Sequence, residues 1–131
     1  MNALSLCPAV TTSRIDECRD FYVGRLGAEP VFDCGWYLIV RFGADSATLA
    51  FMSPRNDRDL PCRPEGLVLN IRVKDVDAEH ARLAALGLDV PDPESHPWGD
   101  RSFSLRDPNG ILLCIYMDIE PDEEYRRYFL K

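Results

Sequence analysis

The side chains most often used for metal binding and nucleophilic catalysis are few in this chain. They are the histidines His80 and His96 and the cysteines Cys7, Cys18, Cys34, Cys62 and Cys114. The odd cysteine count and the lack of any C-x-x-C pair indicate reduced thiols rather than a disulfide framework or a zinc knuckle. No G-x-S-x-G elbow, phosphate-binding loop or dinucleotide fingerprint occurs.

The two histidines differ in their expected settings. His80 lies within a predicted helix, between Glu79 and Arg82, where we expect it to face solvent. His96 lies in a Pro-rich loop beside Trp98. A histidine in a loop is more often structural or solvated than in contact with a ligand.

Composition indicates one soluble domain over residues 1–131, with 46% hydrophobic and 28% charged residues. No run approaches the ~18 apolar residues that span a membrane. No signal peptide is visible, so we expect a cytoplasmic protein. The net charge of −7 argues against nucleic acid as a partner. It is compatible with a cationic small molecule.

The strongest structural signal is a hairpin over residues 101–116. Asp107-Pro108-Asn109-Gly110 is turn chemistry, because Pro108 presets φ and Gly110 tolerates positive φ. The apolar run after it is typical of a strand buried on both faces. A weaker version of this pattern occurs over residues 36–52, which predicts two copies of one unit.

Each copy has the order β-α-β-β-β, which predicts an α+β fold. Module one covers about 4–52, with strands at 4–11, 29–33, 36–42 and 47–52 and a helix over 15–26 that has Ser13 as its N-cap. A Pro-rich linker covers about 53–66. Module two covers about 67–117, with a strand at 67–73, an Asp75-capped helix over 76–86, a short strand near 88–90 and the hairpin. A tail with a short helix covers about 118–131.

Three motifs carry a resemblance to a known group. They are Phe21-Tyr22 with Leu26-Gly27, the run from Val73 to Asp77, and Asp107-Pro108-Asn109-Gly110. Their order and spacing over about residues 4–117 resemble the vicinal-oxygen-chelate superfamily. That group includes glyoxalase I, extradiol dioxygenases, fosfomycin-resistance enzymes and bleomycin-resistance proteins. The resemblance implies two βαβββ modules whose strands curl into an open, U-shaped mixed sheet, with helices outside and a ligand inside.

Metal-using members of this superfamily carry four His, Gln or Glu ligands on the first and last strands of each module. The corresponding positions here are Cys7, Ala50, Val68 and Cys114. None is His, Gln or Glu, so we expect no metal site and no cofactor. Two thiolates alone fall short of the three or more protein ligands that zinc usually has.

Strand alternation separates an inner set of residues from a core set. If Cys7 and Cys114 face the cup, then Met52, Asn70, Arg72 and Tyr116 face it too, whereas their neighbours on each strand form the core. Because a buried charge needs a partner, Arg72 faces either a wet cavity or an acid across a subunit interface. The candidate ligand-binding residues are Trp36, Tyr37, Met52, Asn70, Arg72, Trp98, Arg101, Phe103, Cys114 and Tyr116.

The function these features favour is metal-free binding of a small molecule, of the bleomycin-resistance type. The protein would sequester an antibiotic or an aromatic metabolite, and the resemblance implies a homodimer. Two alternatives stay open. One is a lyase, isomerase or dioxygenase-like enzyme that uses side chains such as Arg72, Arg101, His96 or Tyr116. The other is an association module whose cup is filled by its own side chains.

Overall fold

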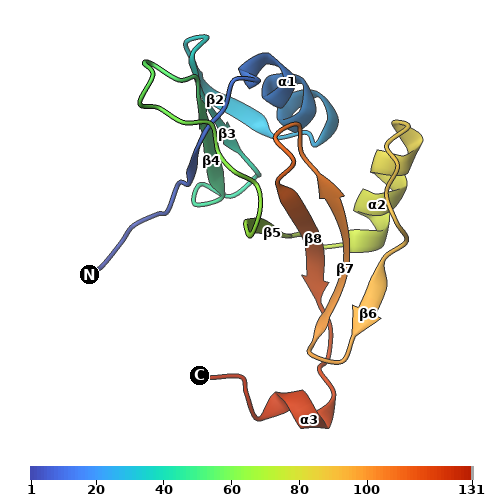
Figure 1. Cartoon of the computed structure of the whole chain (residues 1–131). Helices are drawn as coiled ribbons and strands as arrows, with labels where there is room; N and C mark the ends of the chain where they lie inside the picture. The colour runs from blue at the N-terminus through green and yellow to red at the C-terminus, as the bar shows by residue number, and fades with distance from the viewer. Residues whose placement is uncertain (131) are drawn as a thin grey trace. The chain divides into compact units, whose positions relative to one another are not determined.

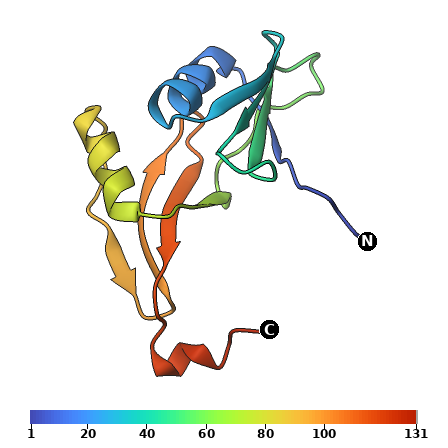
Figure 2. The ribbon, with the colours of Figure 1, turned by 180° about the vertical axis from the view of Figure 1, so that it is seen from behind.

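The computed structural model describes residues 1–130; Lys131, the end of the expected tail, lies outside the described residues. Its contacts divide the chain into two units. Unit 1 contains residues 1–65 together with 107–110, and unit 2 contains 66–106 and the residues from 111 onward. Each unit holds one four-stranded mixed sheet with helix packed on one face (Figures 1 and 2). The predicted α+β class and the two β-α-β-β-β repeats are therefore confirmed.

Unit 1 has the strand order β1-β4-β3-β2. Its elements are β1 (Ala9–Thr11), α1 (Ile15–Arg19), the π-helix η1 (Asp20–Arg25), β2 (Glu29–Asp33), β3 (Tyr37–Arg41) and β4 (Thr48–Met52). β1 pairs with β4 in parallel, and the other pairs are antiparallel. The helix packs against β3 and β4.

Two expectations for unit 1 were wrong. The first strand covers Ala9–Thr11 rather than 4–11, and Leu4 and Leu6 are 100% and 77% exposed. Pro8 has no N–H to give to a sheet, although its carbonyl accepts from Ala50. The expected helix forms, but from residue 20 it is a π-helix, and Thr12 rather than Ser13 supplies the hydroxyl that accepts a backbone N–H, that of Arg14.

Unit 2 repeats the topology with the order β5-β8-β7-β6. Its elements are β5 (Val68–Arg72), α2 (Val76–Ala85), β6 (Glu94–His96), β7 (Asp100–Arg106), β8 (Leu112–Asp118) and α3 (Glu123–Arg126). β5 and β8 are parallel, and the helix α2 packs against β7 and β8. The predicted cap is confirmed, since the Asp75 carboxylate accepts from the N–H of Ala78 at 3.0 Å.

Two details of unit 2 differ from expectation. No strand forms at 88–90, and the edge strand β6 lies instead within the segment expected to be a loop. Glu94, Ser95 and His96 carry no apolar pattern, so β6 exists because β7 pairs with it. β8 was expected to be buried on both faces. It is buried on one face, at Leu113 and Ile115, and half-buried on the other.

Burial alternates along β3 in unit 1 and along β5 and β8 in unit 2. The faces against the helices carry large apolar side chains such as Leu38, Val40 and Phe51 in unit 1 and Leu113 in unit 2, each at 0% exposure. The side chains on the opposite faces are mostly half-buried or exposed, although Ala50 is buried. We call these the open faces of unit 1 and unit 2. Among the described residues, no helix is long and apolar enough to cross a membrane.

A buried polar network lies between α1, η1 and the turn at 107–110. The hydroxyl of Tyr22 donates to Asp107 at 2.8 Å. The backbone and side-chain N–H groups of Asn109 donate to the same carboxylate at 2.8 and 3.0 Å. The Asn109 amide also donates to the Cys18 sulfur at 3.3 Å, and its oxygen accepts from Thr12. Burial and the charge of Asp107 raise the pKa of Tyr22 well above its usual range.

Replacing Tyr22 with Phe should destabilise the protein by about 1–3 kcal/mol, because the buried carboxylate of Asp107 loses one of its donors while the ring volume is kept. Chemical denaturation measures this loss. The matched control is Tyr37→Phe on the open face of unit 1, where we expect a change under about 0.5 kcal/mol. Equal effects of the two substitutions would contradict the role of the network.

The five thiols should differ sharply in reactivity. Cys18 is 0% exposed, and burial is the main reason that its pKa is raised to about 11. A raised pKa leaves less thiolate at pH 8, so Cys18 should resist iodoacetamide until the protein unfolds, while the exposed Cys7 and Cys34 react. Peptide mass mapping after brief labelling at pH 8 and pH 9.5 tests this. Labelling of Cys18 as fast as Cys34 would show the network to be open.

Candidate small-molecule site

The open face of unit 1 holds an aromatic hollow. A volume of about 300 Å³ is lined by Phe32, Trp36, Tyr37 and Ile39. The Tyr37 ring makes edge contacts with Phe32 at 6.1 Å and with Trp36 at 5.8 Å between centroids. Phe32 and Trp36 are 50% and 51% exposed, so two large rings lie half in water. Covering such rings with a flat apolar surface is favourable, because it removes apolar area from water.

Three of the predicted ligand-binding residues lie on or beside this face. Tyr37 and Met52 are paired in register across β3 and β4, and Trp36 directly precedes β3. Phe32 and Ile39 were missed. A bulge in β2 between Pro30 and Phe32 moves Phe32 opposite Ile39, whereas simple alternation would keep it on the face of Pro30.

The charged groups near the hollow are paired with one another. Arg19 donates to both carboxylate oxygens of Asp33, at 2.6 and 2.9 Å. Arg19 and the N–H of Gly35 lower the pKa of Asp33. Arg41 pairs with Glu29 and Asp45. The hollow therefore offers stacking and apolar contact, with its neighbouring charges neutralised.

The open face of unit 2 is polar. The strand register gives two rows across it, Arg72–Tyr116–Ser102 and Asn70–Cys114–Ser104. Arg72 pairs with Asp118 of the same unit at 3.1 Å, and both side chains are about two-thirds exposed. Arg72 thus has an acidic partner within its own unit, and both side chains line a hollow of about 450 Å³. The face supplies hydrogen-bonding groups that can orient a ligand.

Two predicted ligand-binding residues lie on the other face of unit 2. Phe103 is 3% exposed and packs its ring against His80 of α2, at 5.3 Å between centroids. Arg101 makes a bidentate contact with Asp77 in the first turn of α2, at 2.7 and 3.0 Å. Both alternate with Ser102 along β7, so they belong to the helix side. Both were predicted to bind the ligand, whereas the structure places their side chains against α2.

His80 also differs from expectation. Its ring packs on Phe103, its Nε2 lies 3.3 Å from the carbonyl of Val90, and its side chain is 18% exposed. Trp98, which was also predicted to bind the ligand, stacks on His96 and is 47% exposed. The structure therefore places the two histidines in different surroundings, one within the helix packing and one on the polar side.

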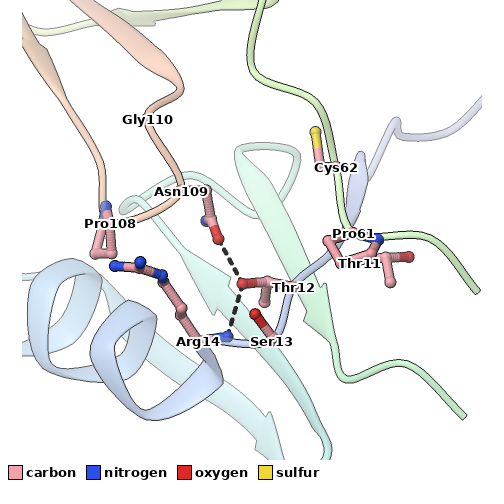
Figure 3. Close-up of a pocket in the computed structure, with 9 residues that line it drawn as sticks. All are labelled: Thr11, Thr12, Ser13, Arg14, Pro61, Cys62, Pro108, Asn109 and Gly110. Atoms are coloured by element: carbon pink, nitrogen blue, oxygen red, sulfur yellow. Dashed lines mark hydrogen bonds between the residues drawn. The ribbon is translucent and has the colours of Figure 1, made fainter.

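A second hollow, of about 270 Å³, lies beside the buried network (Figure 3). Its lining comes from three segments, which are Thr11–Arg14, Pro61 with Cys62, and Pro108–Gly110. Figure 3 shows the Thr12 hydroxyl between the Asn109 side chain and the backbone N of Arg14. The Thr12 hydroxyl is thus used within the protein, and it stabilises the turn. Sequence reasoning did not find this hollow, because only the fold brings the segments together.

The positions at which the resemblance places metal ligands do not fit a metal. Ala50 and Val68 carry no donor atom. Cys7 is exposed and contacts the carbonyl of Pro8, and Cys114 is half-buried. Within residues 1–130, no group of three or more His, Cys, Asp or Glu side chains is arranged to hold a metal ion.

Comparisons with solved structures show the same fold. An antibiotic binding protein, TnmS3, from Streptomyces sp. CB03234 is 26% identical, with a TM-score of 0.71 over 89% of this chain and 97% of that one. A glyoxalase/bleomycin resistance protein from the same strain is 29% identical, with a TM-score of 0.68 over 87% and 98%. A lactoylglutathione lyase from Agrobacterium tumefaciens is 22% identical, with a TM-score of 0.68 over 88% and 95%.

A comparison with curated proteins finds no match. The family model described as the Glyoxalase/Bleomycin resistance protein/Dioxygenase superfamily matches residues 6–115, most of the chain. With the repeated β-α-β-β-β topology, this match shows that the protein belongs to the glyoxalase/bleomycin resistance protein/dioxygenase superfamily.

Proposed function

We propose that the protein binds a small molecule with a flat aromatic part and holds it without changing it chemically. The observation that carries this proposal is the aromatic hollow of unit 1, where Phe32, Trp36 and Tyr37 leave ring surface exposed around a volume of about 300 Å³. A protein surface seldom leaves several large rings together in water unless something covers them.

The superfamily is shared by binding proteins and enzymes, so the site rather than the fold must decide between them. Two of the four positions at which the resemblance places metal ligands, Ala50 and Val68, carry no side-chain donor atom, which supports a function that needs no metal there. A solved relative of 26% identity is described as an antibiotic binding protein. Both points support sequestration, and an antibiotic is one class of ligand to test. A homodimer in the cytoplasm remains part of the proposal.

The chain has two tryptophans, which allows a direct test. Trp36 lines the aromatic hollow, whereas Trp98 lies in unit 2 on His96. In Trp98→Phe, where Trp36 is the only reporter, we expect saturable fluorescence quenching by at least one of three probes: bleomycin, 9-aminoacridine or 1-naphthol. In Trp36→Phe, where Trp98 reports, quenching by the same probe should be absent.

Binding should also stabilise the fold. At a probe concentration 100 times the Kd, the expected gain is about 2.7 kcal/mol, seen as a higher thermal midpoint. Tyr37→Ala should reduce this gain, and mass spectrometry should recover the probe unchanged. Quenching of Trp98 in place of Trp36 would move the site to unit 2, and a midpoint that no probe raises would reject the proposal.

A further inference from the structure

The side chains of His96, Trp98 and Asp100 form one hydrogen-bonded cluster where β6 meets β7. Nδ1 of His96 lies 2.7 Å from Oδ1 of Asp100, and Nε1 of Trp98 donates to Oδ2 of the same carboxylate at 2.7 Å. The His96 and Trp98 rings are stacked at 4.4 Å with 6° between their planes. Each oxygen of one carboxylate thus holds one of two parallel rings.

This arrangement decides where the imidazole carries its proton. A carboxylate only accepts hydrogen bonds, so Nδ1 must be the donor. In the neutral ring, Nε2 then has the free lone pair. The exposed Glu94 carboxylate lies 4.0 Å from Nε2. His96 keeps 24% of its side chain exposed, so a small molecule can reach part of the ring.

The C-terminal segment supports the cluster from outside. The Trp98 ring makes an edge contact with Tyr125 of α3, at 6.4 Å. Ile119 and Asp122 donate backbone hydrogen bonds to the carbonyls of Gly99 and Pro97, at 3.0 and 2.8 Å. Gly99 has a φ of +110°, and an added Cβ would lie 3.1 Å from Pro121. The turn that carries Trp98 is therefore tightly held, which limits motion of the stacked imidazole.

The strand register places this imidazole on the open face of unit 2. His96 is opposite Asp100, which is opposite Asp118, and the adjoining row contains Glu94, Ser102, Tyr116 and Arg72. Residues directly opposite each other on neighbouring strands share a face. The base thus adjoins groups that can orient a polar ligand. The charged groups of these two rows are Glu94 on β6, Asp100 on β7, Asp118 on β8 and Arg72 on β5, which pairs with Asp118.

We propose that His96 is a general base, held in its proton-accepting tautomer by Asp100 and Trp98, and that it acts on weakly acidic small molecules at the open face of unit 2. This activity goes beyond sequestration and uses a different unit from the aromatic hollow. The class of reaction is proton abstraction from an activated C–H or O–H bond. Such a base typically contributes about 10²–10⁴-fold in rate.

The probe is 5-nitrobenzisoxazole, a flat aromatic compound with one acidic C–H bond. Nε2 takes that proton, the C–H electron pair forms the third bond of a nitrile, and the N–O bond breaks with its pair on oxygen. The product is the coloured 2-cyano-4-nitrophenolate, and His96 returns its proton to water. We expect a rate above that of free imidazole at equal concentration.

Matched variants separate a base from a structural histidine. His96→Gln should lower the rate at least tenfold, while His80→Gln, at the chain's other histidine, should leave it unchanged. In Asp100→Asn, Trp98 still needs an acceptor and takes the amide oxygen. The amide N–H₂ then faces Nδ1, which forces the proton to Nε2 and removes the base. When Trp98→Phe is combined with Asp100→Asn, the amide can rotate by 180° and present its oxygen to Nδ1. This double variant should regain part of the rate.

The ¹⁵N chemical shifts of the His96 ring report the tautomer independently of catalysis. They should show Nδ1–H in the parent protein and Nε2–H in Asp100→Asn. A rate no higher than that of free imidazole, or an equal loss in His80→Gln, would overturn the proposal. An Nε2–H tautomer in the parent protein would overturn it as well. None of these outcomes affects the Trp36 quenching test, so the two proposals fail separately.

Discussion

The carboxylate of Asp107, 6% exposed, is the group on which unit 1 depends. A buried charge is costly unless it is hydrogen-bonded, and here Tyr22 and Asn109 supply three N–H or O–H donors to it. Asn109 in turn uses its remaining amide hydrogen and its oxygen on Cys18 and Thr12. The polar groups of the turn, of the start of α1 and of the π-helix thus form hydrogen bonds with one another. Unit 1 is complete only when residues far along the sequence have joined it.

The two repeats use different polar interactions to hold their helices. If Leu26-Gly27 is aligned with Leu86-Gly87, Tyr22 corresponds to Arg82, so the second copy lacks a buried tyrosine at this place. Its helix is a regular α-helix that begins at the Asp75 cap. Its ion pair to the sheet, Asp77 with Arg101, lies near the surface, where such pairs contribute little. The duplication preserves topology, while the polar interactions that stabilise each copy are its own.

The fold could be predicted because period-two alternation and turn chemistry are local signals. The same signals argue against Phe103 as a ligand residue, since it alternates with serines and shares its parity with Leu105. The π-helix, the bulge at β2 and the edge strand β6 have no comparable local signal, because each depends on a partner that only the folded chain supplies. The pairing of His96 with Asp100 is of this kind, since it follows from the register of two strands.

The open faces of the two units differ in chemistry, and the difference limits what each can do. Stacking on Phe32, Trp36 and Tyr37 is favourable because it removes apolar surface from water. It does not require any proton to be at a defined position. Proton transfer at His96, in contrast, requires that one ring nitrogen carries the proton and the other is free to accept one before a ligand binds. The carboxylate of Asp100 meets that need by occupying Nδ1, and the Trp98 indole keeps that carboxylate in place. A histidine lacking such partners would divide its proton between both nitrogens and lose part of its basicity at the exposed one.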